Sequence, residues 1–525
     1  MALAALLTST PAAAQGHFVR GELPVSAAPH DGREDAAPAR PANPPANPTP
    51  RQAEAVPPVP VAAPAVVDIP ADAIAITPQD SAAAIVAATP AGSTFVFTSG
   101  VHRAVEINVR TGDTYLGEPG AVLDAAVPLN TTRYAEAGNG LRQYQGVESD
   151  AATAITGPSC APWFEGGMAI CGHEQEVFRS EMLFADGQRL RHVNAPEDVA
   201  PGSFHYNGET DALTTAGDYT ELAFATADFA FAGWGAEDVT IAGITLRNYA
   251  TPAQHGTIDA YGGNRWTIDG VVVAGSHGYG IRIGQNTTIT NSLITDNGHI
   301  GIGGQADNTS FVATGNEISH NAWLGVQPGF EAGGMKVLFT HDAVVTHNWV
   351  HDNASKGLWF DGFNRNATIA HNRVERSGQT GILYEISFDA EIHDNVVVDN
   401  HTSGDVTESF GNIQIVNSTN VEVHTNTISG GGRHELTLVD TGEEHGLSDV
   451  TVRDNHITIN TSWEAGAYGA KDSRPGGHSP APLSGLTFAD NTVVLDGPHT
   501  LVFATAEGIV DDVRWSEVSS DTIVR

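Results

Sequence analysis

Residues 357–387, GLWFDGFNRNATIAHNRVERSGQTGILYEIS, contain nearly the same phrase twice. The run GLWFD, which ends at Asp361, is followed 24 residues later by GILYE, which ends at Glu385. Between them, the segment ATIAHNRVERS alternates apolar and polar residues and leads into a turn marked by Asn. Asp and Glu are poor strand formers, so a purely structural pattern gives little reason to place them at the same point of two repeats. The stretch therefore predicts a repeated β unit that carries two carboxylates in register.

The same pattern recurs from Val239 to near the end of the chain. Each unit reads apolar-x-apolar, then Asn or Asp, then x-apolar, as in VTIAGITLRN, WTIDGVVVAG, TTITNSLITDN, AEIHDNVVVDN, VEVHTNTISGG and VTVRDNHITIN. The polar marker falls at Asp269, Asn291, Asn316, Asn348, Asn372, Asn395, Asn426 and Asn455. Several steps are 22 to 25 residues long, so each unit holds two or three short strands. Asn suits the turns because it tolerates left-handed backbone angles and its amide can bond to the next Asn of a stack.

A unit of this length cannot bury its apolar face alone. Stacking the units as a right-handed coil buries one face of every strand in a common core and pairs its backbone with the coils above and below. A β-propeller would need a repeat of roughly 40 to 50 residues, and a leucine-rich repeat would need a leucine scaffold. The sequence therefore predicts an all-β, single-stranded right-handed parallel β-helix, and it resembles the pectin-lyase-like superfamily.

Composition limits the function classes. The 525 residues include 25 Lys plus Arg and 62 Asp plus Glu, which gives a net charge of −37. Such a charge opposes binding to nucleic acid or anionic membranes, because phosphate recognition needs a basic surface. No stretch beyond the N-terminus has 18 consecutive apolar residues, so we expect no insertion into a membrane. The oligomeric state cannot be predicted.

Five segments are expected along the chain. MALAALLTSTPAAAQ has an apolar run and small residues typical of a cleaved signal peptide, and a Pro- and Ala-rich linker follows it, so we expect a secreted or periplasmic protein.

Cys160 and Cys171 are expected to form a short-loop disulfide, because a metal site using His173 would lack its remaining ligands. The predicted segments are 1–15 (signal peptide), 16–66 (linker), 67–130 (N-terminal cap, with a short helix at 80–88, and first coils), 131–230 (inserted β-rich subdomain with both cysteines) and 231–525 (main β-helix).

The glycine before each strand gives a common frame for the coils. In this frame the first residue after the origin points inward, which predicts a core column of Ile281, Met335, Leu358, Ile382 and Ile413. Alternation sends the second and fourth residues outward. The second column reads Arg282, Gly303, Lys336, Trp359, Leu383 and Gln414, and the fourth column reads Gly284, Gln305, Leu338, Asp361, Glu385 and Val416.

The fourth column predicts a catalytic pair. Asp361 and Glu385 fall on neighbouring coils, whose backbones lie roughly 4.8 Å apart. Two carboxylates so close repel each other, which raises one pKa and leaves the pair sharing a proton. Such a pair provides one ionised nucleophile and one protonated acid, as glycoside cleavage requires. The expected substrate contacts are Trp359, which can stack on a sugar, Lys336 and Arg282 in the neighbouring column, Glu331 and Trp323 from an insertion, and His255 and Asp259 on earlier coils. We expect no metal or other cofactor.

The phrases LWFDG and LYEIS on successive coils resemble the β-helix β-xylosidase family of glycoside hydrolases, and MLFADGQRL (182–190) is similar to part of an insertion in that family. The resemblance covers roughly residues 90–460 and implies retention of anomeric configuration, with Asp361 as nucleophile and Glu385 as acid/base. Gly362 follows the Asp where the family has an aromatic residue, and Phe388 stands where the family tends to have His-Gly. These departures leave the sugar specificity open.

Two other classes remain open from the sequence. Polysaccharide lyases and C5-epimerases with this fold act on uronates, and they need a base together with Arg or Ca²⁺ to neutralise the substrate carboxylate. Lys336, Arg282 and the carboxylate pair can be assigned to those roles, with Ca²⁺ as cofactor in that case. A non-catalytic glycan-binding solenoid is the third class.

Overall fold

The computed structural model describes most of the chain after residue 63. The described residues are 64–147, 179–326, 328–329, 331–403, 411–432, 434–442, 446–460, 467–472, 485–497, 502–505 and 508–524. The expected signal peptide, nearly all of the expected linker and both cysteines lie outside these residues. No helix in the described ranges is long and apolar enough to cross a membrane.

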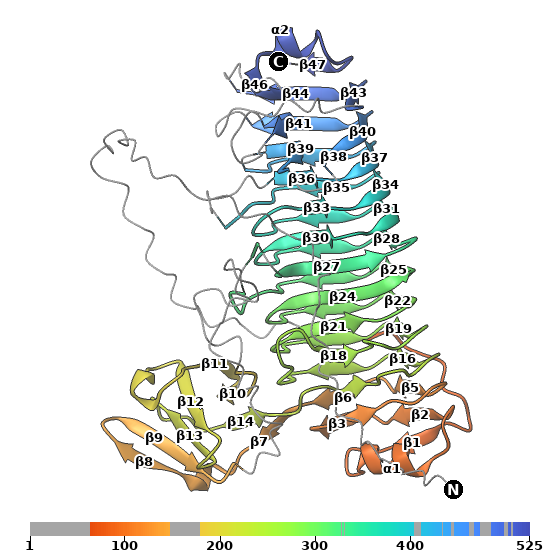
Figure 1. Ribbon diagram of the computed structural model, residues 1–525. Coiled ribbons are helices and arrows are strands. Elements are labelled where there is room, and N and C mark those ends of the chain that lie inside the picture. The colour runs from red at the N-terminus through yellow and green to blue at the C-terminus, as the bar shows by residue number, and fades with distance from the viewer. Residues whose placement is uncertain are drawn as a thin grey trace, which may run out of the picture. The chain divides into compact units, whose positions relative to one another are not determined.

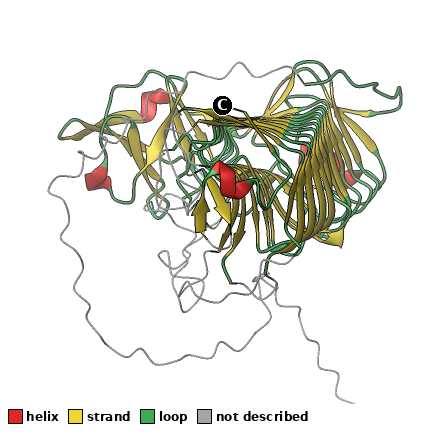
Figure 2. Cartoon of the chain, turned by 90° about the horizontal axis from the view of Figure 1, so that it is seen from above, coloured by secondary structure: helices red, strands yellow, loops and turns green. Residues whose placement is uncertain are grey.

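The chain folds into a right-handed parallel β-helix with three long sheets (Figure 1). Sheet A runs from β1 (Ile74–Ile76) to β43 (Thr487–Ala489), and sheet B runs from β3 (Gly100–Arg103) to β47 (Thr522–Val524). Each turn of the coil adds one strand to each sheet, so that strands of the same sheet lie above one another when viewed along the stack (Figure 2).

Sheet C carries the residues that the sequence singled out. Its strands, in order, are β4 (Ile107–Asn108), β15 (Phe231–Ala232), β18 (Gly256–Asp259), β21 (Tyr279–Ile283), β24 (Ile300–Thr309), β27 (Gly333–Thr340), β30 (Lys356–Asp361), β33 (Ile382–Glu385), β36 (Gly411–Val416), β39 (His434–Asp440), β42 (Tyr468–Asp472), β45 (Phe503–Thr505) and β46 (Gly508–Val510). All of these pair in parallel except the last two, which form an antiparallel hairpin.

The predicted inward column is confirmed. Strand pairing aligns Ile281, Ile302, Met335, Leu358, Ile382 and Ile413 in one row across six coils. Each of these side chains is completely buried in the main core. Burying an aliphatic side chain of this size stabilises a fold by about 1.5–3 kcal/mol, so the row fixes which face of each strand points outward.

Asparagines line the corner between sheets A and B, as predicted for the later coils. Each Asn side chain donates from Nδ2 to Oδ1 of the next at 2.9–3.0 Å, through Asn316, Asn348, Asn372, Asn395, Asn426, Asn455 and Asn491. The two earliest markers were assigned too soon, Asn291 by one residue and Asp269 by two, since the ladder position of its coil is Val271. On the coil before Asn316, the ladder position belongs to Ser292, whose N–H donates to Asn316 Oδ1 at 3.0 Å. Asn291 instead bonds to the carboxylate of Asp269.

The structure describes the N-terminal helix and, outside residues 148–178, the insertion. The helix α1 (Ala82–Ala88) starts at the cap residue Ser81 and buries Ala82 and Val86 against the core of the first coils. The insertion forms a separate eight-stranded sheet in the order β7-β14-β10-β11-β12-β13-β9-β8. Its strands are β7 (Ala126–Pro128), β8 (Tyr134–Gly138), β9 (Leu141–Gln145), β10 (Met182–Ala185), β11 (Gln188–His192), β12 (Ser203–Asn207), β13 (Ala212–Thr215) and β14 (Leu222–Ala225). The sheet begins before residue 131, and a core of its own includes Leu183, Phe204 and Leu213.

Candidate active site

Asp361 and Glu385 are the last residues of neighbouring strands of sheet C. Strand pairing places Asp361 directly opposite Glu385. In both strands the preceding residue, Phe360 or Tyr384, is completely buried in the core, so alternation directs the two carboxylates outward. Both carboxylates are only partly exposed. The predicted pairing of the two residues is therefore present in the structure.

Lys336 holds one member of the pair. It lies on β27, the coil before Asp361, and its Nζ is 2.9 Å from Asp361 Oδ2. Lys336 is only 5% exposed, whereas the Asp361 side chain keeps 22% of its surface exposed. An ion pair that is this well shielded from water is little weakened by solvent, so Lys336 holds the Asp361 carboxylate in position beside Glu385.

Trp359 connects the two lysines to the second carboxylate. Its indole N–H donates to Glu385 Oε2 at 3.0 Å. The Nζ atoms of Lys336 and Lys356 lie 3.8 Å and 4.2 Å from the centre of its ring, within the range of cation–π attraction. Lys356 also donates to Gln379 Oε1 at 3.0 Å and to the carbonyl of Pro328 at 2.7 Å. The indole is therefore held in one position beside the carboxylate pair.

The two carboxylates have different environments. Burial and the negative charge of Asp361 together raise the pKa of Glu385 to about 7, against the opposing effects of Lys356, Lys336 and the Trp359 hydrogen bond. A carboxyl group with a pKa near neutrality can both donate and accept a proton in one reaction cycle. A nucleophile, by contrast, has to stay ionised, so a pKa near neutrality suits Glu385 to the acid/base role.

Glu331 lies in a second buried polar group, close enough to Lys336 to be influenced by its charge. It is 7% exposed, and it accepts hydrogen bonds from Gln254 Nε2 at 2.6 Å and from the Tyr279 hydroxyl. Burial opposes ionisation, but His299, Lys336 and the two hydrogen bonds outweigh it and hold the pKa of Glu331 below its usual range. Both oxygens therefore have protein partners, which fix the position of the Glu331 carboxylate.

His255, Asp259 and Arg282 form a second group on the same sheet. Asp259 Oδ2 is 3.3 Å from His255 Nδ1 and 3.6 Å from Arg282 Nη1, and the Arg282 guanidinium lies 3.8 Å from the ring centre of Tyr261. Asp259 shares a column with Trp359 but is four coils away, which corresponds to roughly 19 Å. The structure therefore does not bring these three residues to the carboxylate pair.

The contacts of Trp323 are with the insertion and with a residue of an earlier coil. Its indole N–H donates to the carbonyl of Asp296 at 2.9 Å, and its ring lies 3.5 Å from the guanidinium of Arg189, a residue of the insertion. Arg189 in turn pairs with the Asp296 carboxylate at 3.2 Å. Trp323 therefore links the insertion to the β-helix in this structure.

The sequence reasoning missed Lys356, Gln379, Tyr279, Gln254 and His299. Tyr279 and Lys356 fall outside the two outward columns of the repeat frame, so the register did not select them. One signal was available for Lys356. The chain contains three lysines, Lys336, Lys356 and Lys471, and two of them flank Trp359. In a protein with so few lysines, two within 20 residues of each other indicated a shared role.

Comparisons with known proteins agree with this architecture. The family model described as the right handed beta helix region matches residues 256–419. The solved structure of XylC in complex with xylose has a TM-score of 0.64 at 14% identity, and the match covers 85% of this chain and 82% of XylC. The A-module of the Azotobacter vinelandii mannuronan C-5 epimerase AlgE4 gives a TM-score of 0.44 at 13% identity, covering 84% of this chain and 91% of the module. A search of curated protein sequences gave no significant match. The chain is a right-handed parallel β-helix protein, and at 14% identity the likeness to XylC shows this fold.

Proposed function

We propose that this chain is an exported glycoside hydrolase that cleaves an oligo- or polysaccharide with retention of anomeric configuration. The proposal rests on one observation, the in-register pair of Asp361 and Glu385 in different environments. Strands of neighbouring coils are separated by roughly 4.8 Å, close to the carboxyl separation of about 5–5.5 Å that retaining enzymes use. An inverting enzyme would need a wider gap for a water molecule.

In this proposal each carboxylate has one role. Asp361, ionised beside Lys336, attacks the anomeric carbon while protonated Glu385 donates its proton to the departing glycosidic oxygen. Glu385 then removes a proton from water, the resulting hydroxide oxygen bonds to the anomeric carbon, and Asp361 is released. Trp359 offers its ring to a sugar face and orients Glu385 through the indole N–H. XylC is a structure solved with xylose, so β-xylosides are the first substrates to test.

Substitution of the pair tests this assignment. Asp361→Ala is expected to abolish turnover of all substrates, because no glycosyl-enzyme can form. Glu385→Ala is expected to retain the first step with a nitrophenyl glycoside, whose leaving group needs no proton, and to recover turnover with azide as a retained glycosyl azide. Thr437→Ala, a change of a buried residue three coils beyond Trp359 in the same column, serves as the control and should remain active. Full activity in either carboxylate variant would contradict the proposal.

A uronate lyase or C5-epimerase is the second candidate. The observation that favours it is the pair of buried lysines on either side of Trp359, because such enzymes neutralise a substrate carboxylate with cations. Incubation with alginate and pectin distinguishes the two candidates. An unsaturated uronate product, detected by its ultraviolet absorbance, or a change in uronate configuration seen by NMR would support this second function and contradict hydrolysis.

Export is part of the proposal. A mature chain that begins near Gln15, identified by mass spectrometry of protein purified from outside the cytoplasm, would support it. A cytoplasmic protein that retains Met1 would contradict it.

A further inference from the structure

A column of histidines follows the corner between sheets A and B. His347, His371, His393 and His424 lie on four successive coils, immediately after or at the ends of β28 (Val344–Thr346), β31 (Arg365–Ala370), β34 (Phe388–His393) and β37 (Thr419–His424). Their ring centres are separated by 5.0, 5.7 and 4.9 Å in that order. His347 and His371 are exposed, and His393 and His424 are half-buried. The rings are therefore gathered on the outer surface of the β-helix.

An aspartate joins the middle of this column. Asp394 Oδ2 lies 2.7 Å from His393 Nδ1. Among the described residues, His371, His393 and Asp394 are the group of three in which each side chain offers one ligand atom within 4.8 Å of the others. The His424 ring, one coil further along, lies 4.9 Å from the His393 ring, so a further imidazole lies next to the group.

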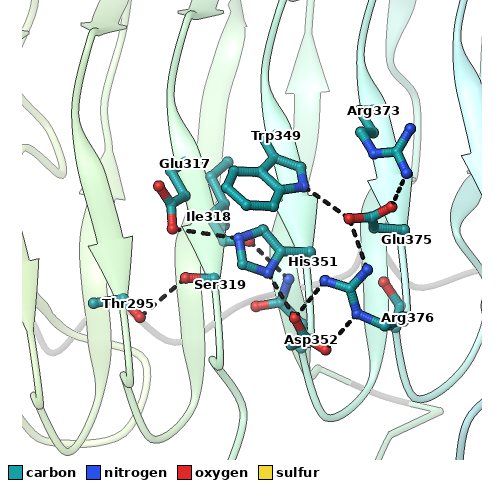
Figure 3. A network of polar contacts seen from close by, with 12 residues as sticks. Thr295, Glu317, Ile318, Ser319, Trp349, His351, Asp352, Arg373, Glu375 and Arg376 are labelled. Atoms are coloured by element: carbon teal, nitrogen blue, oxygen red, sulfur yellow. Dashed lines mark hydrogen bonds and ion pairs between the residues drawn. The ribbon is translucent and has the colours of Figure 1, made fainter. Parts of the chain in front are cut away.

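A second His-Asp pair in the β-helix, His351 and Asp352, is bonded to neighbouring charged side chains (Figure 3). His351 Nδ1 also lies 2.7 Å from the carboxylate of the following residue, Asp352. Arg376 binds both oxygens of Asp352 at 2.8 and 2.9 Å, and His351 Nε2 lies 3.3 Å from Glu317. This histidine is buried, whereas the His393–Asp394 pair faces two further imidazoles. The ligand atoms of the His351–Asp352 pair are therefore already bonded to Arg376 and Glu317, whereas His393 and Asp394 lie next to the imidazoles of His371 and His424.

We propose that His371, His393 and Asp394 bind a divalent late transition metal ion of the zinc class, with His424 or water as the fourth ligand. Imidazole nitrogen and carboxylate oxygen are the ligands that Zn²⁺ uses at about 2.0–2.2 Å, in tetrahedral sites. Ligand atoms in such a site lie about 3.4 Å apart, so on binding the 2.7 Å hydrogen bond between His393 and Asp394 has to open and His371 has to move in toward them. Ca²⁺ and Mg²⁺ prefer all-oxygen sites, which this group cannot provide.

Such an ion would connect coils that are separate in sequence. His371 follows β31, which continues from the strand that carries Asp361, and His393 ends β34, which continues from the strand that carries Glu385. Binding to the folded state alone stabilises it in proportion to the logarithm of the metal concentration. The inference does not depend on the proposed function, because it concerns a different corner of the coil.

The test uses the full chain, stripped with EDTA and titrated with ZnCl2 by isothermal calorimetry. We expect binding of zinc and a zinc-dependent rise in melting temperature, without an effect of Ca²⁺ or Mg²⁺. His371→Asn and Asp394→Asn keep a residue that tolerates the left-handed backbone found at both positions, and each is expected to weaken zinc binding by at least about tenfold.

The matched control is His341→Ala. His341 is an exposed histidine whose Nδ1 lies 3.4 Å from the carboxylate of the following Asp342, and its loss should leave the zinc affinity unchanged. The double variant His371→Asn/His393→Ala should lose both the binding and the zinc-dependent rise in melting temperature, while melting as wild type does in EDTA. Wild-type zinc affinity in the double variant, absence of binding at millimolar zinc, or equal binding of Ca²⁺ would overturn the proposal. If the double variant has a lower melting temperature than wild type in EDTA, the zinc affinity of Asp394→Asn compared with that of wild type decides the outcome.

Discussion

At the scale of single residues, Lys336 is a buried cation beside Asp361 in a chain of net charge −37. It forms the 2.9 Å ion pair with Asp361, and its charge also lowers the pKa of Glu385. One cation therefore acts on both carboxylates: it pairs directly with Asp361, and it opposes the rise that burial and Asp361 cause in the pKa of Glu385. Lysine can do this at a distance because charge interactions weaken slowly in a poorly solvated site.

The first prediction concerns the pH dependence of activity. If Glu385 must be protonated in the first step, kcat/KM falls as the pH rises through its pKa of about 7. Lys336→Met removes a charge that lowers this pKa, so the alkaline limb should move to higher pH. Activity at its optimum should fall by roughly 10²-fold or more, because Asp361 loses its partner. The measurement is the pH profile of kcat/KM on a nitrophenyl xyloside.

Lys471→Met is the control for this change, because it removes the same charge from a strand of sheet C several coils away. Its profile should coincide with that of the wild type. An unshifted alkaline limb in Lys336→Met, or equal shifts in both variants, would show that Glu385 is not the group that titrates.

The residues that were predictable from the sequence are those set by strand alternation. Asp361, Glu385, Trp359 and Lys336 were found because each occupies a fixed place in the repeat frame. Glu331 comes from an insertion that has no repeat, so its burial and its bonds to Tyr279 and Gln254 depend on a loop path that periodicity does not specify. The histidine column was missed for a different reason: its residues end or directly follow strands of sheet A, and the outward columns were assigned only for sheet C.

At the scale of elements, the Asn ladder shows what a repeat predicts and where it fails. The marker pattern identified the buried ladder from Asn316 onward, because each turn needs a side chain that can both donate and accept. On an earlier coil the hydroxyl of Ser292 accepts from the N–H of Val271 at 3.1 Å and fills the same position. Because Asn291 directly precedes Ser292, the sequence pattern took Asn291 as the marker, one residue before the ladder position. A position defined by hydrogen bonding admits more than one residue type, and the sequence pattern does not reveal which neighbour fills it.

The second prediction concerns one rung of this ladder. Asn395 is 1% exposed, accepts from the N–H of Asn372 at 2.9 Å and donates to the carbonyl of Ile369 at 2.8 Å. Asn395→Ala leaves both buried backbone groups without these partners, which should lower the free energy of unfolding by about 2–4 kcal/mol. Urea denaturation followed by circular dichroism measures this. Glu391→Ala, at an exposed position of the same strand β34, should change it by less than about 0.5 kcal/mol, and equal effects would contradict a structural role for the ladder.

At the scale of the whole molecule, a solenoid exposes its core at both ends unless something covers it. The first coils are covered by α1, whose Val86 is buried in the main core. The last coils are covered by α2 (Asp512–Trp515), whose Trp515 is 1% exposed. Each described coil pairs mainly with its two neighbours. The capping interactions at the ends and the candidate site in the middle are therefore separable.

The third prediction uses this separation. The Trp515 ring lies 5.1 Å from Phe503, 4.9 Å from Phe488 and 5.2 Å from Tyr468, and its indole N–H donates to Asp521 at 3.0 Å. Trp515→Ala removes about 3–5 kcal/mol of local packing. Hydrogen exchange should therefore accelerate in the last strands of each sheet and remain slow in β27, β30 and β33. The kcat/KM should stay within about twofold of wild type, because no contact of Asp361 or Glu385 changes.

Val513→Ala, a change of a 68% exposed residue on the same short helix, controls for the substitution itself. Loss of protection that extends evenly into β30 and β33 would instead mean that the β-helix opens as one cooperative unit, in which case the ends of the stack stabilise the site directly.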